Sequence, residues 1–253
     1  RGGRGKVGMG TKEEDFVEKI FITSTHNYLL VFTNKGRVYW LKVYQVPQAG
    51  RAARGKAIVN LVNLMPDEKV SATLPVKDFV ADRFVVMVTK RGIIKKTDLT
   101  AYSNPRQGGI IAVSIDEGDE LVDVQLTDGS QDIFLATRLG MAIRFRESDV
   151  RDMGRTARGV RGISLDEGDD VVGVEIPAHE TFMLTVSENG YGKSTPIDEY
   201  RVQARGGKGI INLKTVAKVG NVSGVLQVIG DEQVMLISST GKVIRLRVNE
   251  IPV

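Results

Sequence analysis

The chain contains no cysteine, only two histidines and a single tryptophan among its 253 residues. Without cysteine there is no disulfide framework, no thiolate metal site and no cysteine nucleophile. His26 and His179 lack a second histidine or paired carboxylates at the spacing of a metal site or a catalytic triad, so we assign both to loops. The composition therefore predicts a chain that is not an enzyme by itself and binds no metal or cofactor.

Long apolar runs and helical periodicity are missing as well. No stretch approaches the roughly 18 apolar residues of a membrane-spanning helix, and none sustains the 3.6-residue apolar period of an amphipathic helix. Apolar residues still make up 42% of the chain, which is enough to build a core. We expect a soluble, cytoplasmic, all-β protein with no membrane partner.

A short segment rich in glycine and basic residues, and free of acidic ones, recurs about every fifty residues. Its copies, here called the basic loops, occupy residues 1–6, 51–56, 105–109, 155–159 and 205–209. Aligned on Gly5, Gly55, Gly108, Gly159 and Gly209, they follow one another at steps of 50, 53, 51 and 50 residues. A repeat of this length suits one small β-sheet per repeat.

Two further elements repeat between the basic loops. An apolar run, a short polar turn ending in glycine and a second run are typical of a β-hairpin. The turn glycines are Gly36, Gly92, Gly140, Gly190 and Gly241. Acidic turns at residues 66–69, 115–120 and 165–170 precede another strand, and their carboxylates lack the spacing of a calcium loop. The pattern predicts a single domain over residues 1–253, a propeller-like ring of about five to six four-stranded blades.

Two motifs resemble nucleotide-binding loops but lack the required context. Residues 3–8 match G-x-G-x-x-G without a strand before them or a helix after them. Lys193 and Ser194 resemble the end of a phosphate-binding loop, yet Ser187 stands where its first glycine belongs. We therefore expect no nucleotide site.

Basic and acidic residues are unevenly distributed, although the net charge is only +4. Windows 1–12, 47–64, 101–115, 153–165 and 200–214 cover 73 residues and hold 15 of the 35 lysines and arginines but none of the 31 acids. Such a row of like charges repels itself unless a polyanion lies along it. A cation at a fixed offset in each repeat emerges on the same side of every blade, so one edge of the ring is expected to contact DNA phosphates.

The candidate DNA-binding residues are cations of the basic loops and of the strand that follows each hairpin turn. They are Arg1, Arg4, Lys6, Arg51, Arg54, Lys56, Arg106, Arg155, Arg158, Arg205 and Lys208 from the loops, Arg161 two residues after the fourth loop, and Lys95, Lys96, Arg144, Lys193 and Arg245 from the strands. We assign the aromatic pair Tyr39 and Trp40 to packing, since no aromatic residue recurs at the position of Trp40. Cations without stacking aromatics favour duplex over single-stranded DNA.

Residues 1–6 resemble the end of the basic signature box Q-[RK]-R-G-G-[RK]-G of the DNA gyrase A protein, and residues 203–209 form a nearly complete copy. Residues 32–39, 43–47, 54–61, 160–163 and 189–193 are also similar to the C-terminal domain of that family, so the resemblance covers essentially the whole chain. It implies a β-pinwheel, a propeller relative in which strands are exchanged between blades. Family members carry six blades, and we expect this chain to be truncated inside its first and last blades.

The resemblance also implies a function and partners. The domain would bind duplex DNA without sequence preference and wrap it with one handedness around its basic rim, which supports negative supercoiling by an ATP-dependent type II topoisomerase. The implied partners are the rest of the gyrase A protein and the gyrase B protein in a heterotetramer at the nucleoid, with ATP and Mg²⁺ only in that holoenzyme. Two alternatives stay open: the corresponding domain of topoisomerase IV, whose basic box is usually degraded, and a protein-interaction β-propeller.

Overall fold

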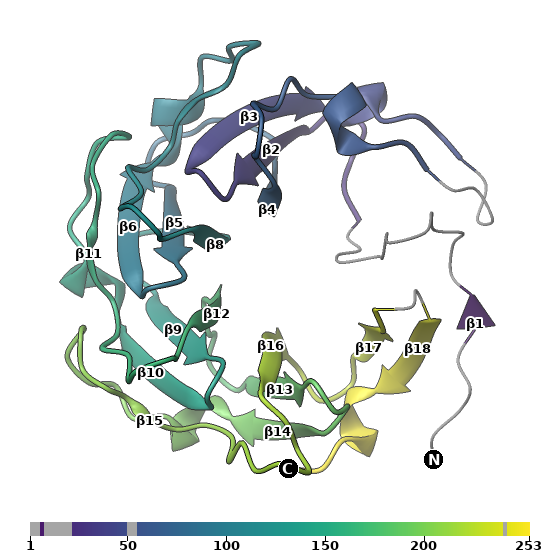
Figure 1. The fold of residues 1–253 in the computed structure, drawn as a ribbon, viewed down its shortest axis with the longest axis vertical. Coiled ribbons are helices and arrows are strands. Elements are labelled where there is room, and N and C mark those ends of the chain that lie inside the picture. Colours follow the sequence, from purple (N-terminus) through teal and green to yellow (C-terminus); the bar gives the residue numbers. More distant parts are fainter. Residues whose placement is uncertain (1–5, 8–21, 50–54, 240–241) are drawn as a thin grey trace.

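The structure is a computed structural model that describes residues 6–7, 22–49, 55–239 and 242–253. The described residues form five antiparallel β-sheets, or blades, placed around a ring (Figure 1). Their helices are short 3₁₀ turns, and none has the length and apolar composition that a membrane span requires. The prediction of an all-β ring of blades is confirmed.

The blades are numbered along the chain, and the strands of each are given from the centre of the ring outwards. Blade 1 holds β4 (Val70–Val76), β2 (Tyr28–Thr33), β3 (Arg37–Lys42) and β7 (Ile110–Ile111). Blade 2 holds β8 (Leu121–Thr127), β5 (Phe84–Thr89), β6 (Ile93–Asp98) and β11 (Val160–Arg161). Blade 3 holds β12 (Val171–Glu175), β9 (Asp132–Thr137), β10 (Met141–Arg146) and β15 (Ile210–Ile211). Blade 4 holds β16 (Val222–Val228), β13 (Phe182–Ser187) and β14 (Gly192–Pro196), and blade 5 holds β17 (Gln233–Ile237), β18 (Lys242–Arg247) and β1 (Lys6–Val7). The 3₁₀ turns are η1 (Val43–Gln45), η2 (Ile58–Asn60), η3 (Leu99–Tyr102), η4 (Glu147–Asp149), η5 (Ile197–Glu199) and η6 (Val248–Glu250).

In blades 1, 2 and 3 the outermost strand comes from the next repeat. β7 follows the β5–β6 hairpin of blade 2 in the sequence but pairs with β3 of blade 1. In the same way β11 returns to β6, and β15 returns to β10. In Figure 1, β11 and β15 therefore lie at the outside of the ring, each on the blade that precedes its own repeat. The strand exchange expected of a pinwheel is confirmed.

The hairpin turns owe their shape to a hydroxyl and a glycine three residues apart. Gly36, Gly92, Gly140 and Gly190 have φ angles of 75°, 84°, 92° and 78°. These positive values close the turn, and a residue with a side chain rarely adopts them. Before each glycine, Thr33, Thr89, Thr137 or Ser187 accepts a hydrogen bond from the backbone N–H four residues later. The turns place the hairpins in the same register in each of these blades.

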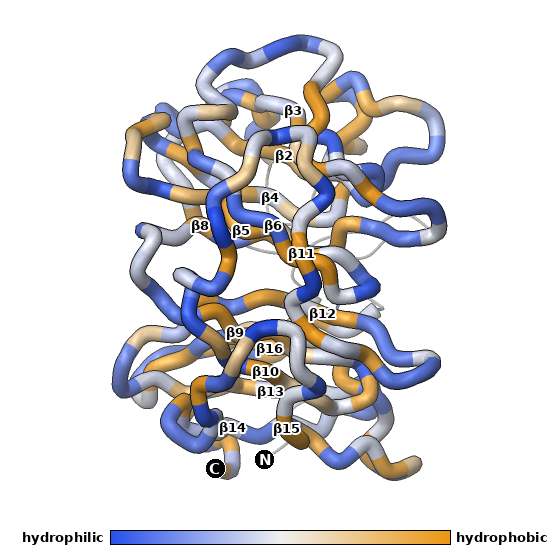
Figure 2. The backbone as a smooth tube through the Cα atoms, turned by 90° about the vertical axis from the view of Figure 1, so that its left-hand side faces the viewer, coloured by the Kyte–Doolittle hydropathy of each residue, from blue (hydrophilic) through white to orange (hydrophobic). Residues whose placement is uncertain are grey.

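The core lies between neighbouring blades. One cluster joins Leu30 and Phe32 of blade 1 to Val85 and Met87 of blade 2, and the next joins the facing sides of blades 2 and 3. Figure 2 shows hydrophobic stretches along the strands and largely hydrophilic turns towards the two edges of the ring. Two more clusters join blade 3 to blade 4 and blade 4 to blade 5, so consecutive blades pack on one another.

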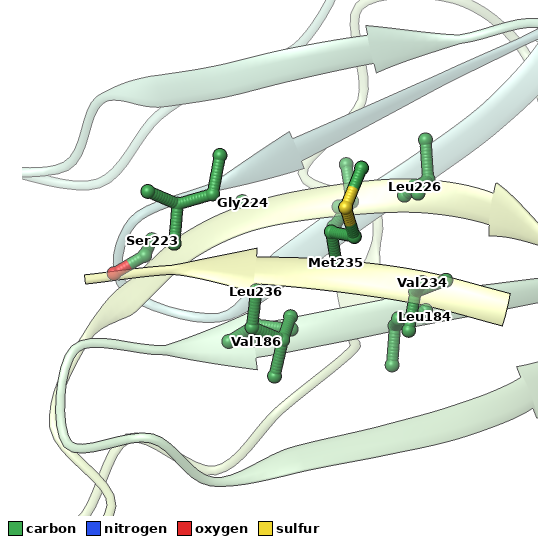
Figure 3. A pocket seen from close by; sticks show the side chains of 10 residues that line it. Leu184, Val186, Ser223, Gly224, Leu226, Val234, Met235 and Leu236 are labelled. Carbon is green, nitrogen blue, oxygen red and sulfur yellow. The ribbon is translucent and has the colours of Figure 1, made fainter. Parts of the chain in front are cut away.

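An apolar groove of about 330 Å³ opens between blades 4 and 5 (Figure 3). It is lined by Leu184 of β13, Leu226 of β16 and Met235 of β17, and the latter two are each 49% exposed. In blade 4, β13 pairs with β16 on the side nearer the centre of the ring. In blade 5, the equivalent side of β17 pairs with no strand of the described part of the chain. The groove carries no charged side chain and does not suit a phosphate or a catalytic centre.

The hairpin glycines give the first prediction. Gly140→Ala should lower the free energy of unfolding by more than the about 1–2 kcal/mol that a left-handed backbone costs by itself, because a Cβ there would overlap the Leu213 carbonyl oxygen. Gly168→Ala is the matched control, since Gly168 has a φ of 75° but no atom within 4 Å of the added Cβ. Urea unfolding of both variants measures the difference. Equal losses would show that the close approach at Gly140 does not contribute.

Candidate nucleic-acid interface

Two of the basic loops cross the outer edge of the ring. Residues 151–159 leave η4, pass β6 through a parallel bridge between Lys96 and Asp152, and enter β11. Residues 201–209 leave η5 and repeat this path beside β10, with a bridge between Arg144 and Val202. The two loops therefore occupy equivalent places on successive blades, along the outside of the ring in Figure 1.

A positive φ identifies the equivalent glycine of each loop. The φ angles of Gly55, Gly109, Gly159 and Gly209 are 67°, 66°, 100° and 77°. The alignment on Gly108 is therefore wrong by one residue, and the steps around this copy are 54 and 50 residues. A Cβ at Gly159 or Gly209 would overlap a carbonyl oxygen of the adjacent hairpin strand. The glycine is needed because the loop backbone lies directly against that strand.

A serine from the preceding repeat binds the backbone of the loops at residues 155–159 and 205–209. Ser114 donates its N–H to the Ala157 carbonyl at 3.2 Å and its hydroxyl to the Thr156 carbonyl at 2.6 Å. Ser164 makes the same two bonds to Gly207, at 2.9 Å, and to Gly206, at 2.7 Å. These bonds fix the position of both loops without using their charged side chains.

The two recurring cation positions of these loops differ in what they contact. Arg155 donates from Nη1 to the Ile111 carbonyl on β7 at 3.0 Å. Arg205 lies across β11 in the same way and donates to the carbonyls of Arg161 and, at 3.0 Å, Asp149. The second position is occupied by Arg158 and Lys208, which are exposed and form ion pairs with acidic turns.

Other predicted residues are exposed without an ion pair to any described residue. They are Lys56, Arg106, Arg161 and Arg245. Lys193 is half-buried, and burial lowers the pKa of its ammonium group. Arg1, Arg4, Arg51 and Arg54 lie outside the described residues, and Lys6 is described only by its backbone pairing with Val243. Among the predicted cations, Arg155, Arg158, Arg205 and Lys208 lie on the loops that cross the outer edge beside β6 and β10.

The structure corrects three of the predicted strand cations. Lys95 is 1% exposed, and its ammonium donates to the carbonyls of Ala112, Gly154 and Arg155. Lys96 is buried beside Glu147, with Nζ and Oε1 3.7 Å apart. The guanidinium of Arg144 lies 2.8 Å from Asp132 and donates to the Ile197 carbonyl at 2.9 Å. Their predicted place on the DNA-contacting surface is wrong, because these side chains bond to the interior of the protein.

The aromatic pair of the first hairpin packs as predicted. Tyr39 is 1% exposed and donates to Glu68 at 2.5 Å. The Trp40 indole donates to the Tyr102 carbonyl at 2.8 Å. Neither ring is placed for stacking on a base.

Where the loops cross β6 and β10, two exposed cations lie beside the predicted ones. Arg151 and Arg201 begin the outer crossing, each one residue before the parallel bridge to β6 or β10. Their spacing of fifty residues was a usable signal, but Arg151 falls outside the acid-free windows because Asp152 follows it. Within the described ranges, no group of three or more metal-ligating side chains comes together.

Comparison with known proteins identifies the family. The protein-family model described as "DNA gyrase C-terminal domain, beta-propeller" matches residues 1–24, 27–77, 83–128, 131–178, 181–228 and 232–253. The chain belongs to this family. Among curated relatives, the DNA gyrase A protein of Salmonella typhimurium is 47% identical over 253 residues, and that of Clostridium acetobutylicum is 53% identical over 251.

These gyrase relatives are much longer than the chain. It spans 29% of the Salmonella protein and 30% of the Clostridium protein while being covered to 100% and 99% itself. A solved gyrase A C-terminal domain superposes with a TM-score of 0.82 at 26% identity, over 97% of this chain and 83% of that one. The C-terminal domain of a DNA topoisomerase IV superposes with a TM-score of 0.79 at 29% identity, over 90% and 71%. The matching family model and the gyrase relatives do not favour the topoisomerase IV alternative.

Lys95 gives the second prediction for this gyrase-family domain. Burial lowers the pKa of Lys95 from 10.5 to about 7; Arg155 acts in the same direction and Asp152 opposes it. Between these values the unfolded chain binds one proton more than the folded chain, so the free energy of unfolding should rise by up to about 1.4 kcal/mol per pH unit. Below pH 7 both states hold the proton, and the contribution to the slope vanishes.

Urea unfolding across this pH interval checks the assignment. Lys95→Met should remove the rise, whereas Lys56→Met, at an exposed lysine, should retain it. A rise that persisted in Lys95→Met would assign the titration to another group.

Proposed function

We propose that this chain binds duplex DNA along its outer edge and wraps it, with contacts to phosphates rather than to bases. The observation that carries the proposal is the recurrence of cations at the same offsets on successive blades, on loops whose backbone is fixed. Arg155 and Arg205 are one such pair, and Arg158 and Lys208 are the other. Phosphate contacts position a protein on the duplex but carry no sequence information, so binding should tolerate any sequence.

Curvature of the ring favours wrapping over binding at one patch. Bending 20–30 base pairs through 40–90° costs about 1–6 kcal/mol, and a single basic site cannot offset continued bending. Contacts that recur on each blade can, since every added length of bent DNA reaches another loop. A protein-interaction propeller would give no reason for five acid-free basic windows.

We further propose that the chain acts within a DNA gyrase A protein, together with the gyrase B protein, in ATP-dependent negative supercoiling in the cytoplasm. Support comes from the names and length of its curated relatives, of which it spans about 30%. In this proposal DNA cleavage, ATP and Mg²⁺ belong to other parts of the assembly, and this domain contributes binding, bending and the handedness of the wrap.

A salt titration tests the phosphate contacts. Each contacted phosphate lowers the slope of log K against log salt by about 0.9 on duplex DNA. Lys56, Arg106, Arg155 and Arg205 of the basic loops and Arg161 of β11 form no ion pair with a described residue, and together they predict a slope of about −4.5 or steeper. Titration of random-sequence duplexes at several salt concentrations measures it. A flat response, or tight binding to one sequence alone, would overturn the proposal.

Footprint length distinguishes a wrapping surface from a local site. Arg106→Ala, Arg161→Ala and Arg205→Ala should each weaken binding modestly and shorten the protected DNA, because each removes the contact to a different phosphate. Combining them should add the effects. Arg83→Ala removes an exposed charge outside the basic loops and serves as the control. Complete loss of binding from one substitution, with the others silent, would favour a single local site.

A further inference from the structure

The acidic turns reach the outer edge and pair with cations of the basic loops. Arg158 approaches Asp116 with Nε 2.7 Å from both carboxylate oxygens and Nη2 2.5 Å from one of them. Lys208 approaches Asp166 with Nζ 2.6 Å from Oδ1. Each pair joins residues 42 positions apart, so the second is the first repeated one blade further on. The Arg158 guanidinium lowers the pKa of Asp116, which keeps this carboxylate charged.

These ion pairs are not what holds the loops in place. Ser114 and Ser164 already bind the loop backbone, each two residues before the aspartate. The side chains of Arg158 and Asp116 are 53% and 41% exposed, and those of Lys208 and Asp166 are 70% and 61% exposed. Exposed pairs of this kind contribute little to folding, so a structural role does not account for them.

The chain contains an internal comparison. In the first acidic turn, Glu68 donates its N–H to the Met65 carbonyl just as Asp119 donates to Asp116 and Asp169 to Asp166. Met65 thus stands where the other turns have aspartate. The loop that would face it has Gly108 before Gly109, at the position of Arg158 and Lys208. Among the three described pairs of turn and loop, the one that lacks the acid also lacks the cation.

We infer that Asp116 and Asp166 set the DNA affinity of the outer edge by competing with phosphate for Arg158 and Lys208. This inference rests on the proposed function. A carboxylate and a phosphate oxygen use the same donors of a guanidinium or an ammonium group. DNA must therefore displace an aspartate before a phosphate can contact Arg158 or Lys208. Each such contact releases fewer counterions than a phosphate contact with an unpaired cation would. The pairs would keep the wrap weak enough to exchange.

The test uses the 253-residue chain and a random-sequence duplex. The double variant Asp116→Asn, Asp166→Asn should bind more tightly and steepen the log–log salt slope by about 1.8, which is 0.9 for each freed cation. Between about 50 and 200 mM salt its affinity should then fall about tenfold more than that of the wild type. Adding Arg158→Ala and Lys208→Ala in this background should return the slope to its wild-type value.

The matched control is Glu117→Gln with Glu167→Gln. These exposed acids belong to the same turns and form no ion pair with a described residue, so the variant removes equal charge without freeing a cation. It should leave the slope unchanged. If both double variants gave the same slope, the inference would be overturned while the proposed function stood. If the wild type and every variant failed to bind duplex DNA, the proposed function itself would be wrong and the inference with it.

Discussion

The close contact between a loop backbone and the outer hairpin strand of the preceding blade is the constraint on which this structure depends. Gly159 and Gly209 lie so near the carbonyls of Ile94 and Ala142 that no side chain fits. The same contact lets β11 and β15 pair one blade back and ties successive blades together. Ring architecture and the placement of the charged loops are therefore consequences of one backbone approach.

That approach also decides what each cation can do. A cation on the hairpin strand can point under the crossing loop and donate to the carbonyls of that loop, as Lys95 does to Gly154 and Arg155. Side chains on the crossing loop itself point to solvent or lie across the outer strand, as Arg158 and Arg155 do. A buried ammonium is tolerated because carbonyl oxygens take the place of water. Basic residues thus have two roles: those on the hairpin strand bind the loop backbone, and those on the loop carry charge at the surface.

The acidic turns combine a structural and an electrostatic task. Asp119 and Asp169 are buried and accept hydrogen bonds from the hairpin turns at Arg91 and Leu139. Asp116 and Asp166, three residues earlier, point to the outer edge and meet the loop cations. The later aspartate of each turn, Asp119 or Asp169, shapes the blade, and the earlier one, Asp116 or Asp166, shapes the charge of the outer edge.

The repeat, the hairpins and the all-β ring were determined by the sequence itself, because glycine positions and the alternation of apolar residues are local properties of the chain. The local sequence pattern also indicated Lys56, Arg106 and Arg161, which are exposed. The sequence could not show that Lys95 and Lys96 are buried, that Arg144 is paired with Asp132, or that Arg158 and Lys208 have acidic partners 42 residues away. Strand exchange decided the first and the last of these, since it brings the loop of one repeat onto the hairpin and acidic turn of another, and burial and Coulomb interaction depend on distance in space rather than along the chain.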